Sequence, residues 1–412
     1  MLSPFALAPL LRTDLPAPAA RYSGFPAFNF VGGHNDPDST PVDGLLEAVN
    51  AVIRREGRTL ATYGLESGPQ GYRPLRDFLV DKLQRDAGIA CSADEILLTS
   101  GSLQGIDLIN AMLVAPGDTV IIEQDCYGGS ITRLQRLGAK VIGIPLDGDG
   151  LRTDALAAVL EDLKSRGVTP KYIYTIPTIQ NPTATIMPLA RRRALLDLAM
   201  AHGVPIFEDE CYSDLVFEGG RPPAIMALAR EAGWPGVIHI GSFSKSVAPA
   251  LRVGYVVADW EILSRLLSLK TDAGSGALEQ MVLAEFCSRH FEGHVARLNA
   301  TLKGKRDALV EALHEHFGTA AEFDVPPGGI FLWVTLPATV DTSRLYAVAA
   351  AAGIAINPGA EWSVDAGHGR RRLRLCFANP TREVIRAGVA ALAEVCHREM
   401  GVPERIANVQ QS

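Results

Sequence analysis

The 412-residue sequence lacks the marks of several specialised classes of protein. It has 6 cysteines, no two closer than 20 residues, and no CxxC motif. Neither a zinc knuckle nor a dithiol redox centre is therefore indicated, and we expect a reduced, cytoplasmic setting. No run approaches the roughly 18 consecutive apolar residues of a membrane helix, so no membrane partner is expected.

Positive charge is also scarce. The 39 Lys+Arg residues against 46 Asp+Glu residues give a formal charge of −7, which argues against nucleic acid as a partner. Two short basic runs, at 191–193 and 370–372, are interpreted as solvent-exposed faces. Residues 1–11 are apolar, but prolines interrupt them and no basic residue precedes them, so a signal peptide is not expected.

Common catalytic motifs are missing as well. The sequence has no GxxxxGK phosphate loop, no GxGxxG after a strand and no GxSxG, so neither a nucleotide cradle nor an esterase nucleophile is indicated. His290 and His294 are four residues apart, but the glutamate of HExxH is absent. We interpret them as a pair on a helix surface and predict no metal site.

What the sequence does contain is a regular alternation of short apolar runs and helical patterns between about residues 45 and 287. Seven strands are expected, at 96–99, 119–123, 140–144, 172–176, 205–208, 237–240 and 254–258. Helices expected at 103–113, 152–163 and 189–202 separate several of them. This pattern predicts an α/β fold with a seven-stranded, mostly parallel sheet, whose ligands bind beyond the carboxyl ends of the strands.

The rest of the chain differs. We predict an N-terminal arm at 1–44 that joins a small domain, a large domain at 45–290 and a smaller α+β domain at 291–412. Within the small domain we expect a helix at 294–317, strands at 330–335, 354–357 and 372–377, and a last helix at 382–399.

Lys245 has the most informative surroundings. It follows a predicted strand, lies beside Ser242 and Ser244, and precedes Arg252 by seven residues. Hydroxyls and a second cation near an amine favour an anion site. A partly desolvated lysine in a cationic pocket has a lowered pKa and can form a Schiff base.

The segment 242–254 fits the pattern Ser-x-Ser-Lys-x3-Pro-x2-Arg-x-Gly. It resembles the pyridoxal-phosphate-dependent class I/II aminotransferases of fold type I, closest in pattern to the 2-aminoadipate and kynurenine types, and the resemblance extends from Phe30 onward. It implies pyridoxal 5′-phosphate as cofactor and Lys245 as the catalytic Schiff-base lysine. The implied phosphate ligands are Ser242, Ser244 and Arg252.

Two further segments carry the resemblance. Residues 209–212 match the family's Asp-x-x-Tyr, which implies that Asp209 binds the pyridine nitrogen and Tyr212 the phenolic oxygen of the cofactor, both with catalytic roles. Residues 181–183 match Asn-Pro-Thr, which implies that Asn181 contacts the same oxygen and the substrate.

The remaining implied cofactor contacts come from the first half of the chain. Ser102 and the Leu103 amide would bind the phosphate at a helix start, although the family often has Gln at the second position. Tyr127 would stack on the pyridine ring. Tyr63 resembles the tyrosine that reaches the neighbouring subunit's phosphate, which implies a homodimer with shared active sites.

The predicted strand at 372–377 contains the arginine that we expect to bind the α-carboxylate of the substrate. Its period-2 alternation places Arg374 opposite the apolar residues, and the family's arginine at this place clamps the carboxylate, with Arg372 as the competing choice. Gly33 is expected to line the substrate pocket. His34, Asn35 and Asp36 depart from the family pattern, and we hypothesise that they favour a polar or cationic substrate side chain.

These matches predict a transaminase that moves an amino group between an L-amino acid and a 2-oxo acid. A β/γ-elimination, cyclisation or decarboxylation enzyme stays open, because all of these reactions share one carbanion. A transcriptional regulator is disfavoured, since the roughly 40 residues before Pro41 are too few for a DNA-binding module.

Overall fold

The computed structural model describes residues 5–13, 15–19, 21–22 and 24–403. Its centre is a seven-stranded sheet in the order β2-β10-β9-β8-β7-β3-β4. The strands are β2 (Ile96–Thr99), β3 (Thr119–Glu123), β4 (Lys140–Ile144), β7 (Ile173–Thr175), β8 (Ile206–Asp209), β9 (Val237–Ser242) and β10 (Gly254–Val257). Only β10 pairs antiparallel, with β2 and β9, so the predicted mostly parallel sheet is confirmed.

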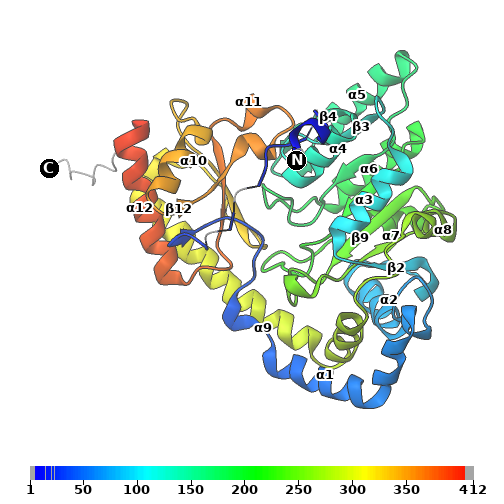
Figure 1. The fold of residues 1–412 in the computed structure, drawn as a ribbon. Coiled ribbons are helices and arrows are strands. Elements are labelled where there is room, and N and C mark those ends of the chain that lie inside the picture. The colour runs from blue at the N-terminus through cyan, green and yellow to red at the C-terminus, as the bar shows by residue number, and fades with distance from the viewer. Residues whose placement is uncertain (1–4, 14, 20, 23, 404–412) are drawn as a thin grey trace.

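Helices cover both faces of this sheet (Figure 1). One face packs against α2 (Arg73–Ala87), α5 (Thr153–Ser165), α6 (Leu189–His202) and α7 (Ile225–Glu231). The other packs against α3 (Ser102–Leu113), α4 (Gly128–Arg136) and α8 (Trp260–Leu269). Strands buried on both sides explain the continuous apolar runs of the sequence.

A second, smaller sheet has the antiparallel order β11-β14-β13. Its strands are β11 (Phe331–Thr335), β13 (Asn357–Pro358) and β14 (Arg372–Cys376). The strand expected at 354–357 is split, and its first part, β12 (Ile354–Ala355), pairs with β1 (Phe28–Asn29) of the N-terminal arm. The other elements here are α10 (Thr342–Ala351), α11 (Ala366–Gly369) and α12 (Arg382–Met400).

Helix α9 (Ala277–Phe317) connects the two parts of the chain. It begins 17 residues before the helix that the sequence predicted at 294, so our domain boundary at 290 lies inside it. Helix α1 (Val42–Glu56) packs against the first half of α9. The remaining elements are the hairpin β5 (Leu146–Asp147) and β6 (Gly150–Leu151), and the 3-10 turns η1 (Ala8–Leu10), η2 (Pro37–Ser39), η3 (Gly57–Ala61), η4 (Tyr63–Glu66), η5 (Ala93–Glu95), η6 (Pro249–Leu251), η7 (Gly318–Ala320) and η8 (Gly359–Trp362).

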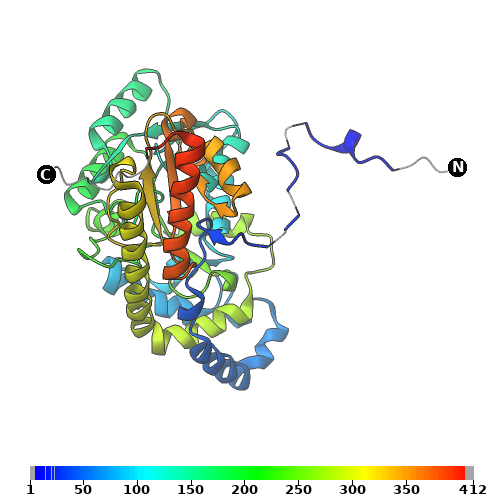
Figure 2. The same cartoon turned by 90° about the vertical axis from the view of Figure 1, so that its left-hand side faces the viewer.

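Figure 2 shows the chain before β1 extending away from the rest of the molecule. Along this stretch Phe5, Leu10 and Tyr22 expose 71% to 80% of their surface. Within the described residues, no helix is long and apolar enough to cross a membrane.

Two side chains that we expected at the surface are buried. Arg192, from the basic run at 191–193, is fully buried, and its guanidinium donates to Thr178 Oγ1 at 2.8 Å and lies 3.4 Å from Glu210 Oε1. His294 is 3% exposed and its Nε2 lies 2.8 Å from the Ser246 carbonyl oxygen. Both expectations were wrong because partners distant in the sequence satisfy these polar groups.

Candidate active site

A cavity of about 300 Å³ lies at the carboxyl ends of the central strands and is closed on one side by the small sheet. Every predicted cofactor-binding, catalytic and carboxylate-binding residue except Tyr63 lines it, and so does Gly33, whereas His34, Asn35 and Asp36 do not. The cavity therefore lies where parallel-sheet proteins bind their ligands.

Lys245 follows β9 and points into this cavity. Its Nζ donates to the Gly33 carbonyl oxygen at 2.7 Å, and a Cβ on Gly33 would come within 2.5 Å of that nitrogen. Burial lowers the pKa of Lys245 to about 8, and the nearby charges of Arg374 and Arg252 act in the same direction. At pH 7 about one-tenth of this amine is therefore unprotonated and can act as a nucleophile, far more than for an ordinary lysine.

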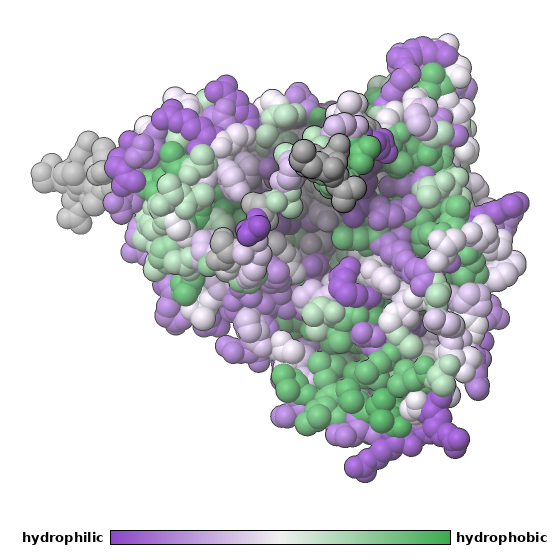
Figure 3. Space-filling model, viewed as in Figure 1, coloured by the Kyte–Doolittle hydropathy of each residue, from purple (hydrophilic) through white to green (hydrophobic). Residues whose placement is uncertain are grey.

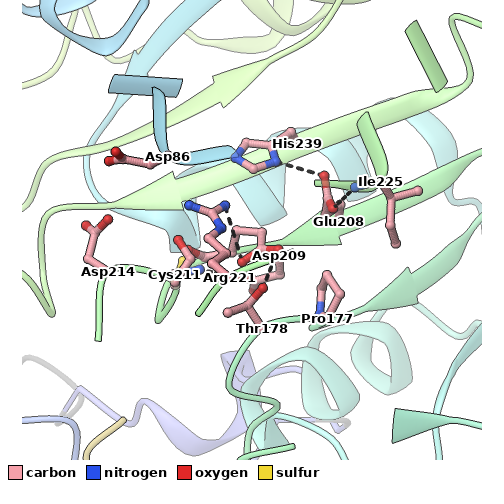
Figure 4. Close-up of polar contacts among 12 residues, drawn as sticks. Asp86, Pro177, Thr178, Glu208, Asp209, Cys211, Asp214, Arg221, Ile225 and His239 are labelled. Carbon is pink, nitrogen blue, oxygen red and sulfur yellow. Dashed lines mark hydrogen bonds and ion pairs between the residues drawn. The ribbon is translucent and has the colours of Figure 1, made fainter. Parts of the chain in front are cut away.

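The run of three acidic residues at 208–210 is divided by the alternation of β8. Asp209 lines the cavity, whereas Glu208 binds His239 Nδ1 at 2.9 Å and the Ile225 amide at 2.6 Å on the other side (Figure 4). Glu210 pairs with buried Arg192. The structure thus presents one carboxylate of the three to the cavity, and burial raises its pKa.

Asn181 and Tyr212 line the cavity and contact each other. The Asn181 amide donates to the Tyr212 hydroxyl at 3.5 Å, and its Oδ1 accepts a hydrogen bond from Arg374 at 3.0 Å. Asn181 precedes a cis peptide bond to Pro182. Burial raises the pKa of Tyr212, so this hydroxyl stays protonated and can donate.

Arg374 lies on the middle strand of the small sheet. Its second terminal nitrogen donates to Asn357 Oδ1 and to the Gly32 carbonyl oxygen, both at 3.1 Å. The guanidinium lies 3.8 Å from the ring centre of Trp362. Its Nε is buried without a hydrogen-bond partner among the described residues, so the group has donor capacity to spare for a carboxylate.

Arg372, the competing choice, lies elsewhere. Its guanidinium contacts the Asp125 carboxylate and lies 2.8 Å from His368 Nε2, and it does not line the cavity. Arg374 and Arg372 have the same strand parity, so alternation alone could not separate them.

Ser102, Ser242, Ser244 and Arg252 line another part of the cavity and together form a site suited to an anion, here called the anion cradle. Ser102 begins α3, and Ser242, Ser244 and Arg252 come from β9 and the turn after it. Gly101, with φ of 76°, lets the Arg252 guanidinium approach, because a Cβ there would lie 2.3 Å from its Nη2. Free helix amides, hydroxyls and a guanidinium together suit a phosphate group.

Sequence reasoning missed two residues that support this site. Trp362 ends the 3-10 turn η8 and stacks on Arg374. Glu123, at the end of β3, is fully buried and accepts from Gln180 Nε2 at 2.9 Å, which holds the residue before Asn181. Burial raises the pKa of Glu123 to about 7. An acidic residue at the end of an apolar strand was the signal available in the sequence.

The hypothesis that His34, Asn35 and Asp36 favour a polar or cationic substrate side chain stays a prediction, but the structure gives Asp36 a partner inside the protein. Asp36 is 4% exposed, and its carboxylate accepts from Lys305 Nζ of α9 at 2.6 Å and from Ser39 Oγ. His34 is exposed and packs edge-on against Phe25, with 5.3 Å between ring centres. The charge of Asp36 is thus neutralised inside the protein and ties the arm to α9.

Asp36→Ala is therefore expected to leave the ratio of kcat/KM for lysine to that for leucine unchanged. Removing one partner of a buried ion pair should lower the free energy of unfolding by about 3–5 kcal/mol, which urea denaturation measures. Adding Lys305→Met should restore part of that loss. A tenfold change in the substrate ratio would instead show that Asp36 acts on the substrate.

Comparison with known proteins agrees with this geometry. Residues 33–392 match the family model of aminotransferase class I and II. A 2-aminoadipate transaminase of Thermus thermophilus is 33% identical over 366 residues, which cover 88% of each chain. The crystal structure of α-aminoadipate aminotransferase from the same organism, complexed with N-(5′-phosphopyridoxyl)-L-leucine, has a TM-score of 0.83 at 33% identity and covers 90% of this chain and 92% of its own.

A kynurenine aminotransferase of Pyrococcus horikoshii is also similar, with a TM-score of 0.84 at 32% identity over 90% of this chain and 91% of its own. These matches and the cavity at the strand ends support one conclusion. The chain belongs to the class I and II aminotransferases, pyridoxal-phosphate enzymes of fold type I that transfer an amino group between an amino acid and a 2-oxo acid.

Proposed function

We propose that Lys245, Asp209 and Arg374 carry out this transamination together in the 300 Å³ cavity. The observation that carries the proposal is the convergence of a partly buried amine of lowered pKa, a buried carboxylate and a guanidinium with spare donors on one cavity. When bound, pyridoxal phosphate supplies an aldehyde and an electron-withdrawing ring.

The cradle residues Ser102, Ser242, Ser244 and Arg252 would hold the cofactor's phosphate, and the Leu103 amide would add a donor at the start of α3. Tyr127 would cover one face of the ring. Asp209 would bind the ring nitrogen and keep it protonated, while Asn181 and Tyr212 would donate to the phenolic oxygen.

Arg374 binds the α-carboxylate of the amino acid. Its present acceptors are neutral amide and carbonyl oxygens, and a carboxylate forms stronger, charge-assisted hydrogen bonds with the same nitrogens. The Lys245 amine would bond the cofactor's aldehyde, and the same amine would take the Cα proton of the amino acid and return it on the product side. Gly33 gives this amine room to move.

A half-reaction tests the proposal. Holoenzyme mixed with an excess of an amino acid should release one 2-oxo acid per site and then stop until an oxo acid is added. Screening amino acids with neutral, acidic and basic side chains identifies the substrate. Continuous release of ammonia, or of carbon dioxide, would show elimination or decarboxylation instead.

We also propose a homodimer in which Tyr63 completes the partner's site. Tyr63 is 87% exposed and lies outside the cavity of its own chain. Val42, Leu46 and Ile53 of α1 expose 41% to 64% of their surface, and Figure 3 shows a hydrophobic patch over this helix. Sedimentation at micromolar concentration should give twice the 44.1 kDa chain mass, and a monomer with full activity would refute this arrangement.

A reduced, cytoplasmic compartment is proposed on the state of the cysteines. All six are free, and four of them, Cys126, Cys287, Cys376 and Cys396, are buried. Localisation of a tagged chain tests this, and export from the cytoplasm would contradict it.

A further inference from the structure

Asp209 is contacted from the neighbouring strand by a residue that no sequence motif singled out. Tyr174 of β7 lies directly opposite Phe207 of β8, and Asp209 is two positions farther along the same face. Such diagonal neighbours lie within reach of a long side chain. The Tyr174 hydroxyl donates to Asp209 Oδ2 at 2.6 Å, and Tyr174 is 2% exposed.

The carboxylate is held at both oxygens. Its other oxygen, Oδ1, accepts from the Cys211 amide at 3.1 Å. Among the described residues no lysine, arginine or histidine forms an ion pair with Asp209, although the group is buried. Two neutral donors therefore fix the plane of this carboxylate and help to stabilise its charge.

We propose that Tyr174 is a positioning residue for the transamination, which holds Asp209 ionised and aimed into the cavity. This inference rests on the proposed contact between Asp209 and the ring nitrogen of the cofactor. Without the phenol, Asp209 would be a stronger base and free to rotate about its side chain. It would then share more of the ring-nitrogen proton, and the ring would withdraw electrons less strongly.

The chain contains a matched control on the same strand. Tyr172 is also 2% exposed, packs edge-on against Phe207 as Tyr174 does, and donates at 2.6 Å to a buried acceptor. That acceptor is Asn110 of α3, which does not line the cavity. Tyr172→Phe therefore removes an equivalent buried hydrogen bond without touching Asp209.

The experiment compares holoenzyme carrying Tyr174→Phe with holoenzyme carrying Tyr172→Phe. For Tyr174→Phe we expect kcat to fall about 10- to 100-fold, the range for a hydrogen bond to a charged group, with little change in KM for the amino acid. The dissociation constant of pyridoxal phosphate should rise by a similar factor. The midpoint of the pH-dependent change in cofactor absorbance should move up by roughly one pH unit. Tyr172→Phe should leave all three quantities unchanged.

Equal effects of the two substitutions would assign them to packing and overturn the inference. No effect of Tyr174→Phe, with a large effect of Asp209→Asn on absorbance, would overturn it while leaving the proposed function intact. No effect of Asp209→Asn either would remove the proposed role of Asp209 itself. If Tyr174→Phe does not fold, 3-fluorotyrosine at position 174, a stronger donor, should move the absorbance midpoint down, and an unmoved midpoint overturns the inference.

Discussion

Lys245→Ala is expected to lower kcat/KM by at least about 10⁴-fold, the upper range for loss of a positioned acid-base group. In the proposed function the variant would lose both the nucleophile that bonds the cofactor and the base that takes the Cα proton. Borohydride reduction followed by intact-mass measurement and peptide mapping should find the cofactor on Lys245 of the wild type. The variant should carry no label, while phosphate contacts still allow reversible binding of the cofactor.

Lys171→Ala provides the control, because this lysine side chain is 41% exposed and pairs with Asp118 at the surface. It should keep full activity and the label.

A second test of the role of Lys245 measures how the bonding rate depends on pH. Because the pKa of Lys245 is lowered to about 8, the rate at which cofactor-free protein bonds the aldehyde should rise as pH rises through 8 and then level off. A label on another lysine would refute the assignment.

Much of the central sheet could be predicted, because its signals are local. Apolar runs mark strands that are buried on both faces, and the motif residues lie at or just after the ends of these strands: Asp209 ends β8, and Lys245 follows β9 by three residues. In a parallel sheet the carboxyl ends meet at one edge, so the positions of the motifs along the chain already imply that they converge. The structure brings them to one cavity.

The rest depended on contacts between distant residues, which local patterns do not record. Asp36 and Lys305 are 269 positions apart, and nothing near Asp36 indicates that its charge is already paired. The same holds for Arg192, which looked like part of a surface run but reaches Glu210. The sequence placed Tyr174 in a buried strand but gave no partner for its hydroxyl. That partner, Asp209, comes from the neighbouring strand β8, so it follows only from the pairing of β7 with β8.

The alternation of side chains along β8 explains how three consecutive carboxylates can be buried without facing one another. Ionised side chains so close together repel each other when buried, and the strand separates them by sending Glu208 and Glu210 to the face opposite Asp209. There Glu208 meets His239, and Glu210 meets Arg192 and Arg221. Asp209 is left on the cavity side without a cation of its own, and in the proposed function the protonated ring nitrogen supplies that charge.

Asp209→Asn should therefore lower kcat by about 10³-fold while the fold and the bond to Lys245 persist. An ion pair at about 4 Å is worth about 4 kcal/mol at an effective dielectric constant of 20, and each 1.36 kcal/mol corresponds to a tenfold change in rate. Single-turnover absorbance measurements would place the loss in the step that removes the Cα proton. Glu208→Gln is the matched control, since it changes a carboxylate one position away that faces His239; it should lower stability and leave the cofactor spectrum unchanged. An Asp209→Asn variant that keeps the wild-type rate would mean that the charge on the ring nitrogen is maintained by another group.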